Sequence, residues 1–221
     1  NIKMAASFSV DKVAPKHNFR TGQIPANVDP SRIKDNVVII DNLHGRTIEQ
    51  YTNDELQPFI DEHNARQKRK DRKIDSTYTE WHKADKNMMK GVEKPEDLKW
   101  AWEAVLCYGN HEDYWHEYFD PSTSEERRKE MYDEAVEFYT KATYAFKLKY
   151  PHLELLYSVL HADENFGSLH CHLCFQGRGR DYERSLVERV SISRALEQDG
   201  FEHIHSATMA KDAGGFQMER M

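Results

Sequence analysis

The sequence predicts a mixed α+β domain with a β-hairpin near its centre. A helix pattern opens after Ser124, carries apolar residues at helical spacing and stops at Pro151. Two apolar segments follow at residues 153–162 and 168–176, and the short connection around Gly167 predicts that they form a hairpin. We find no repeats, so helix and strand patterns follow one another in a single mixed order.

The N-terminal half gives shorter patterns. Residues 5–10 predict a first strand, residues 15–30 a loop with several helix breakers, and residues 37–40 a short buried strand. Thr52 followed by Glu55 resembles a capping box and predicts the start of a helix. Its apolar face continues at helical spacing through Leu56, Phe59, Ile60 and His63. This helix is expected to run into a basic segment, although Pro58 lies late for a first turn.

The remaining segments lie on either side of the long helix and the hairpin. Residues 75–99 are polar and interrupted, which predicts irregular structure, and residues 101–108 alternate as a strand does. Residues 177–190 are interpreted as a charged linker. Residues 191–199 predict a short helix that Gly200 ends.

Length and composition favour one soluble domain. At 221 residues with 38% hydrophobic content, the chain can bury one sizeable core, and we expect residues 1–221 to form a single domain. No apolar run reaches the length of a membrane span. Three cysteines, an odd number, argue for a reducing compartment, and the N-terminus lacks signal-peptide features. Together these features predict a cytoplasmic protein.

The charge is unevenly distributed along the chain. The whole chain has a net charge of −7, yet residues 1–90 carry 16 Lys and Arg against 13 Asp and Glu. A local basic segment can bind phosphates even in an acidic protein. A solvated helix end is the equally weighted alternative for such a segment. The candidate DNA-binding residues are Arg66, Lys68, Arg69, Lys70, Arg72 and Lys73, with Arg32 and Lys34 upstream.

Three histidines of the predicted hairpin point to a metal site. On the first strand, His161 shares a face with Leu155, Tyr157 and Val159; on the second, His170 and His172 share a face while Cys171 points away. If these faces coincide, three imidazoles converge and can hold one divalent cation with open positions. Histidines that merely line a surface and a structural zinc site are the alternatives.

Four further polar or sulfur-bearing residues belong to the hairpin. Asp163 and Glu164 lie in the connecting loop, where they can orient a ligand or accept a proton. Cys171 and Cys174 have C-x-x-C spacing, but a strand places them on opposite faces. We therefore interpret them as small hydrophobic residues, with Cys174 able to share the histidine face.

A second cluster, His17-Asn18-Phe19-Arg20, lies far upstream in the predicted loop. A separate histidine beside an arginine can supply a nucleophile and an anion clamp. Polar loop residues usually just face solvent, so this motif is weak by itself. Tyr51 and Tyr78 are the competing nucleophiles.

The sequence around this motif is more specific. It comprises Ala6-Ser7-Phe8-Ser9-Val10, Lys16-His17-Asn18-Phe19-Arg20, residues 27–36, the segment Ala65–Ile74 and Trp102-Glu103-Ala104-Val105-Leu106. With the hairpin motifs, it resembles the Mob/Pre family, the MobV-type plasmid mobilisation and recombination relaxases. The resemblance covers roughly residues 5–201, with the motifs in family order.

The resemblance implies a histidine-hydrophobe-histidine (HUH) endonuclease domain, an antiparallel sheet flanked by helices with a metal site on a central hairpin. Family members are bacterial enzymes that nick one strand of plasmid DNA at the transfer origin and stay joined to the 5′ end. The implied partner is therefore single-stranded or supercoiled plasmid DNA. Members tend to be longer, so the resemblance implies an N-terminal catalytic fragment, with homodimerisation possible through residues beyond Met221.

The family motifs also imply roles for individual residues. The H-N-x-R motif makes His17 the nucleophile, which forms a phosphoramidate, and places Arg20 on the scissile phosphate, with Asn18 in support. The H-x-D-E motif matches His161, Asp163 and Glu164, with Glu164 catalytic and Asp163 supporting. The H-x-H motif matches His170 and His172. The implied metal is Mn²⁺ or Mg²⁺ on His161, His170 and His172, and such a site can capture Zn²⁺ or Ni²⁺ on purification.

One departure from the family concerns the hairpin loop. Members usually have a short Thr-Pro before H-x-H, whereas residues 165–169 form a longer loop without proline. Two other functions are weighed against the relaxase. One is a non-catalytic origin-binding or copy-control protein that keeps the metal hairpin as a structural element. The other is a metallohydrolase of small phosphoesters, which the basic segment disfavours.

Overall fold

The computed structural model describes residues 5–7, 13–85, 89, 94, 98–109, 111–164, 167–181 and 186–201. Its helices and strands are β1 (Ala5–Ser7), α1 (Pro15–Asn18), β2 (Val37–Asp41), α2 (Ile48–Arg66), α3 (Tyr78–Ala84), β3 (Trp102–Cys107), α4 (His116–Phe119), α5 (Glu125–Lys149), β4 (Leu153–His161), β5 (His170–Arg180), β6 (Glu188–Val190) and α6 (Ile192–Gln198). None of the described helices combines the length and apolar character needed to cross a membrane.

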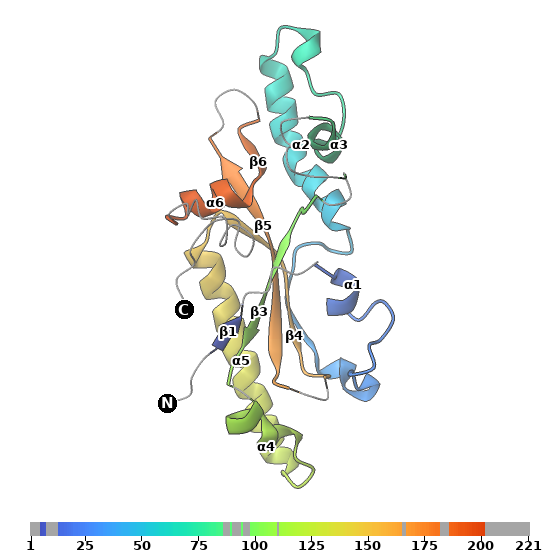
Figure 1. Cartoon of the computed structure of the whole chain (residues 1–221), viewed down its shortest axis with the longest axis vertical. Helices are drawn as coiled ribbons and strands as arrows, with labels where there is room; N and C mark the ends of the chain where they lie inside the picture. The colour runs from blue at the N-terminus through green and yellow to red at the C-terminus, as the bar shows by residue number, and fades with distance from the viewer. Residues whose placement is uncertain are drawn as a thin grey trace.

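The strands form one antiparallel sheet in the order β1-β3-β5-β4-β2, and β6 pairs with the far end of β5 (Figure 1). The hairpin β4–β5 is therefore central, with β3 on one side and β2 on the other. Helices lie along the sheet and at its ends (Figure 1). The predicted α+β class, with an antiparallel sheet flanked by helices, is confirmed.

The long helix α5 covers one face of this sheet. It begins at the N-cap Ser124, whose side chain accepts a hydrogen bond from the Arg127 backbone, and it ends before Tyr150. Its buried side chains recur at helical spacing and pack on apolar residues of β4 and β5, as the sequence predicts. They are Met131, Ala135, Tyr139, Thr143 and Phe146.

The hairpin agrees with its prediction except at one position. A bulge between Leu155 and Tyr157 shifts the pairing of β4 with β5. Leu155 consequently packs in the core beneath α5, whereas Tyr157 and Val159 pack on the opposite face. The expectation that Leu155 shares the histidine face is therefore wrong, because one extra residue in a strand reverses the alternation before it.

The N-terminal elements differ from the predictions in two places. Within residues 15–30, expected to be a loop, Pro15–Asn18 form the short helix α1. The strand β2 is half-buried rather than buried, because it forms an edge of the sheet beyond β4 and Val38 is 51% exposed. The first strand is confirmed for residues 5–7, and its predicted continuation lies outside the described residues.

Helix α2 begins five residues earlier than predicted. Its capping box is Thr47 with Gln50, not Thr52 with Glu55. The predicted apolar face is correct, since Leu56, Ile60 and His63 are buried and Phe59 packs against their cluster; Pro58 is accommodated inside the helix.

The basic segment 66–73 is not a continuous helix. Helix α2 ends at Arg66, and Lys70–Arg72 form only a 3-10 turn. Tertiary hydrogen bonds fold the chain back here: His63 Nε2 bonds to the Arg72 carbonyl, and the Asn64 amide bonds to both backbone groups of Ile74. After this turn, α3 occupies part of the segment that we expected to be irregular, capped by Thr77 with Glu80.

The charged segment after the hairpin is structured in part, contrary to the linker prediction. Strand β5 continues to Arg180, and β6 pairs with it through Glu188–Val190. The buried Glu188 carboxylate accepts hydrogen bonds from Arg178 Nε at 2.7 Å and Arg180 Nε at 2.8 Å, so the charges here hold two strands together. Helix α6 follows as expected, and Gly200 adopts a φ of +92° just after it.

Candidate metal centre

The hairpin register brings the three predicted histidines together at one end of the sheet. His161, the last residue of β4, lies directly opposite His170, the first residue of β5, and His172 lies opposite Val159. The ring centroids of His161 and His172 are 4.6 Å apart, those of His170 and His172 5.1 Å, and those of His161 and His170 5.4 Å. All three rings lie on the sheet face opposite α5, where Cys174 also points.

One nitrogen of each ring bonds to a carbonyl or carboxylate oxygen, and the second is the potential ligand atom, which in His161 also lies 3.2 Å from Arg20 Nη2. His161 Nε2 donates to the Asn18 carbonyl at 2.9 Å, and His170 Nδ1 donates to the Ser168 carbonyl at 3.0 Å. His172 Nδ1 bonds to Glu103 Oε1 at 2.8 Å, while its buried Nε2 has no hydrogen-bond partner within the described residues. A buried polar atom without a partner is costly, and a metal ion is one group that satisfies it.

The donor set therefore fits a divalent cation. Two sets of potential ligand atoms lie within 4.8 Å of one another: one joins His17, His161 and His172, and the other joins His161, Glu164 and His170. His161 is common to both. Imidazole nitrogens with one carboxylate suit Mn²⁺, Zn²⁺ or Ni²⁺. Burial lowers the pKa of His170 to about 4, so this ring is neutral near pH 7, as a metal ligand must be.

Arg20 connects the two sequence clusters. Its guanidinium donates to both oxygens of Asp163, at 2.7 and 2.8 Å, and to Glu164 Oε1 at 2.9 Å. Its Nη2 also lies 3.2 Å from His161 Nδ1. Arg20 adopts a φ of +52°, a conformation that a non-glycine residue rarely takes, directly after α1. The side chain is 3% exposed, so the site already holds one buried cation among acidic and imidazole groups.

The loop before β2 fixes the two carboxylates. Asn36 Nδ2 donates to Asp163 Oδ2 at 2.8 Å, and its Oδ1 accepts from the Ala162 backbone. Asn27 Nδ2 donates to Glu164 Oε2 at 3.2 Å. Burial opposes ionisation of Asp163, but the hydrogen bonds from Arg20 and Asn36 outweigh it and lower the pKa of Asp163. Asn27 and Asn36 belong to the segment 27–36 that carries part of the resemblance, but no role was predicted for them.

Helix α1 presents His17 to the cluster. The His17 ring centroid is 5.7 Å from that of His161 and 6.1 Å from that of His172, and Nε2 lies 3.8 Å from Glu164 Oε1. Burial, followed by the positive charge of Arg20, lowers the pKa of His17, so its imidazole is neutral near pH 7. The side chain is 36% exposed, which leaves it accessible to a substrate. His17 thus lies beside the predicted ligands, although it is distant from them in sequence.

Glu103 is the main site residue that the sequence analysis missed. Its buried carboxylate accepts hydrogen bonds from Asn18 Nδ2 at 2.6 Å and from His172 Nδ1, and the Tyr157 hydroxyl lies 3.3 Å away. Burial favours the neutral acid, but these donors outweigh it and lower the pKa of Glu103. A carboxylate behind a metal-binding imidazole fixes its orientation and raises its basicity. The sequence feature that could have identified Glu103 is its position as a lone acidic residue inside the apolar strand 101–108.

The predicted DNA-binding residues are not part of this cluster. The segment 66–73 begins at the last residue of α2 and lies at the opposite end of the molecule from the β4–β5 loop (Figure 1). The cationic side chains of this segment are exposed. Arg32 lies over the ring of Tyr118 and donates to its hydroxyl at 2.8 Å, whereas Lys34 is exposed.

The two competing tyrosines are buried. Tyr51 is 4% exposed and its hydroxyl bonds to Glu154, while Tyr78 is fully buried and accepts a hydrogen bond from the Val190 backbone. Burial and the nearby Glu154 raise the pKa of Tyr51, which makes its hydroxyl a poorer source of phenolate. Their surroundings favour packing roles over nucleophilic ones.

Comparisons with known proteins return a structural neighbour. No family model and no curated protein matches the chain. Among solved structures, the chain is similar to the MobM relaxase domain (MOBV; Mob_Pre), bound to plasmid pMV158 oriT DNA in an Mn-bound crystal structure at pH 6.8. The two share 17% sequence identity with a TM-score of 0.45, over 99% of this chain and 89% of that chain. The neighbour carries the family name that the sequence motifs resemble.

Proposed function

We propose that this chain is a metal-dependent DNA strand transferase of the relaxase type, which nicks one strand at a plasmid transfer origin and keeps the 5′ end on His17. The observation that carries this proposal is the position of His17. An accessible, neutral imidazole lies beside three clustered imidazoles and a buried arginine, and one of those imidazoles, His172, has a buried nitrogen without a partner among the described residues. These are a nucleophile, a metal-binding set and an anion clamp within one site.

The metal would be held by His161, His170 and His172, whose ring centroids lie 4.6 to 5.4 Å apart, with Glu164, which shares a potential ligand set with His161 and His170, close enough to take part. Such a cation would stabilise the negative charge that develops on the phosphate oxygens during displacement. Mn²⁺ or Mg²⁺ is the proposed working metal. The role of Glu103 is to hold His172 with Nδ1 engaged, so that Nε2 faces the ligand side.

The proposed displacement uses His17 as the attacking group. One imidazole nitrogen bonds to phosphorus, the bond from phosphorus to the 3′ oxygen breaks, and the 5′ phosphate stays on His17 as a phosphoramidate. The proton that the imidazole releases balances the one that the leaving 3′ oxygen takes up. Glu164, 3.8 Å from His17 Nε2, is placed to orient the ring and relay that proton. Arg20 would clamp the phosphate by exchanging part of its carboxylate contacts for phosphate oxygens.

The other expectations belong to the same proposal. Residues 1–221 would act as one catalytic domain, the partner would be single-stranded or supercoiled plasmid DNA, and the compartment would be the bacterial cytoplasm. The phosphate-binding role of Arg32, Lys34 and the basic segment 66–73 is also part of it. The exposure of that segment supports a contact with DNA backbone outside the metal centre.

The direct test compares His17→Ala with His116→Ala, an exposed histidine on α4 outside the site. Supercoiled DNA of the replicon that encodes this chain is incubated with each protein and Mn²⁺, and nicking and covalent adducts are scored on denaturing gels. We expect His17→Ala to lose both, with metal and DNA binding retained, and His116→Ala to match the wild type. The wild-type adduct should be acid-labile, because protonating a phosphoramidate nitrogen makes it a good leaving group. An acid-stable adduct that persists in His17→Ala would reject the proposal.

A further inference from the structure

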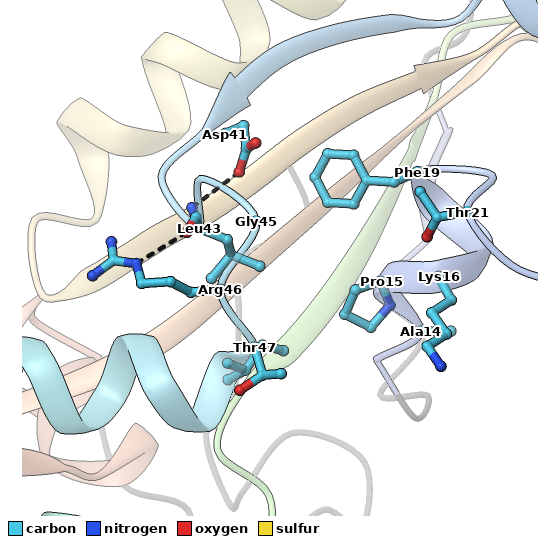
Figure 2. A pocket seen from close by; sticks show the side chains of 11 residues that line it. Ala14, Pro15, Lys16, Phe19, Thr21, Asp41, Leu43, Gly45, Arg46 and Thr47 are labelled. Carbon is cyan, nitrogen blue, oxygen red and sulfur yellow. Dashed lines mark hydrogen bonds between the residues drawn. The ribbon is translucent and has the colours of Figure 1, made fainter.

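A pocket lies beside the metal centre, on the other side of α1. It encloses about 730 Å³ between α1 and the loop that connects β2 to α2 (Figure 2). Ligand sites of proteins fall in this size range. Pro15, Lys16 and Phe19 line one wall, and Leu43, Gly45 and Thr47 line the wall across from them (Figure 2).

Helix α1 connects this pocket to the proposed nucleophile. Within one helical turn, consecutive residues point in different directions. His17 contacts the histidine cluster and the buried Asn18 bonds to Glu103, whereas Lys16 and Phe19 line the pocket. A group that fills the pocket therefore contacts Lys16, the residue next to His17 on the same helix.

The chemistry of the pocket suits a flat heteroaromatic ring that is attached to a phosphate. Its walls are largely apolar, with the Phe19 ring braced against Tyr157 at a centroid distance of 5.0 Å and with Leu43 buried. Asp41 adds a carboxylate that already accepts from the Leu43 and His44 backbones. An oxygen of Asp41 retains acceptor capacity for a ring N–H group. Lys16 is exposed at the edge of the pocket and makes no ion pair within the described residues.

We propose that this pocket binds one unstacked nucleobase of the DNA strand whose neighbouring phosphate lies at His17. The inference rests on the proposed function, because the strand must pass the metal centre for its next base to reach α1. Phe19 supplies a face for stacking, Asp41 an acceptor for the base edge, and Lys16 a charge for the adjoining phosphate. Binding of this base would fix which phosphodiester of the strand stands in front of His17.

The experiment compares two strands with the same number of phosphates. Fluorescently labelled dT8 and a fully abasic eight-residue strand are titrated with the 221-residue protein and Mn²⁺ at fixed salt, and binding is followed by anisotropy. The pocket-filling variant is Thr21→Trp, and Phe19→Leu is the second variant, which removes the ring but keeps an apolar side chain. Ala145→Trp adds the same indole to the exposed side of α5 and serves as the control.

We expect the wild type and Ala145→Trp to bind dT8 at least about fivefold more tightly than the abasic strand, as stacking of one base requires. Thr21→Trp and Phe19→Leu should lose most of that preference through weaker dT8 binding, with unchanged affinity for the abasic strand and for Mn²⁺. A wild type that binds both strands equally, or pocket variants that keep the preference, would overturn the nucleobase site and leave the proposed function standing. A wild type that binds neither strand would overturn both.

Discussion

The two faces of the central hairpin differ in chemistry although both are built from alternate residues of the same two strands. Toward α5 the hairpin presents Leu160, Cys171 and Leu173, all fully buried in an apolar core. Toward α1 it presents His161 and His172, which are also buried but are hydrogen-bonded to polar groups. The comparison teaches that burial alone does not separate core from site. The site differs from the core because its buried side chains carry polar atoms, most of which are hydrogen-bonded and one of which, His172 Nε2, has no partner among the described residues.

This division predicts that stability and metal binding can be changed separately. Apolar side chains beneath α5 contribute through area removed from water and through close packing. Polar side chains toward α1 offset their own burial through hydrogen bonds, so the net contribution of each pair to stability is modest. Substitutions on the α5 face should therefore change mainly the free energy of unfolding, and those on the opposite face mainly the affinity for metal.

The largest expected effect is on the α5 face. Leu173→Ala should lower the free energy of unfolding by about 2–5 kcal/mol, because it opens a cavity in a fully buried position. The protein that remains folded should bind Mn²⁺ with wild-type affinity, since Leu173 points away from the histidines. Urea unfolding gives the first quantity and isothermal titration of the folded variant the second. Loss of metal affinity in the folded protein would contradict the separation of the two faces.

The next largest effect is on the opposite face. His170→Ala should weaken binding of Mn²⁺ by more than about 100-fold, beyond what loss of an outer-shell partner causes. The unfolding free energy should change little in metal-free protein, because His170 lies at the strand end, where its ring bonds to the Ser168 carbonyl and lies 4.0 Å from Glu164 Oε1. The control is His152→Ala, a half-buried histidine paired with Asp199 at 2.7 Å near the other end of the hairpin. Intact metal binding in His170→Ala would remove this residue from the ligand set.

Glu103→Gln should have an intermediate effect. The amide keeps the size of the carboxylate but loses its charge, so the His172 imidazole is held less firmly as a ligand. Mn²⁺ affinity should fall by about 10- to 100-fold. Glu154→Gln, on β4 of the same sheet, should leave affinity unchanged. An unchanged affinity in Glu103→Gln would mean that packing around His172, and not the carboxylate, sets its orientation.

The hairpin and its histidines were predictable because alternation and spacing are local properties of the sequence. Strand patterns on both sides of Gly167 were enough to place His161, His170 and His172 on one face. The bulge beside Leu155 was not predictable, since no glycine or proline marks it. Pairing with β5 decides that position, and pairing is a tertiary property.

The surroundings of the histidines were less predictable. Glu103 reaches His172 through the pairing of β3 with β5, and Asn36 reaches Asp163 through the pairing of β2 with β4. The end of α2 was missed for a similar reason. Its sequence continues with good helix formers, but hydrogen bonds between Asn64 and Ile74, one in each direction, fold the chain back instead. Propensity is outweighed there by contacts that no local window contains.

The smallest expected effect concerns the basic segment, which belongs to neither face of the hairpin. Lys68, Arg69, Arg72 and Lys73 are exposed, but Arg69 already bonds to Asp71 at 2.6 Å, so its charge is partly neutralised. Replacing all four with alanine should lower DNA affinity alike for all sequences and flatten its salt dependence, by up to about one unit of slope per lost phosphate contact. Metal affinity and stability should stay unchanged, because these side chains contact neither face. The matched control removes four lysines of α5, namely Lys129, Lys141, Lys147 and Lys149, which changes the net charge equally on the far side of the sheet. If both quadruple variants flattened the salt dependence to the same extent, long-range charge would explain the effect, and the basic segment would be a solvated turn without a specific contact to DNA.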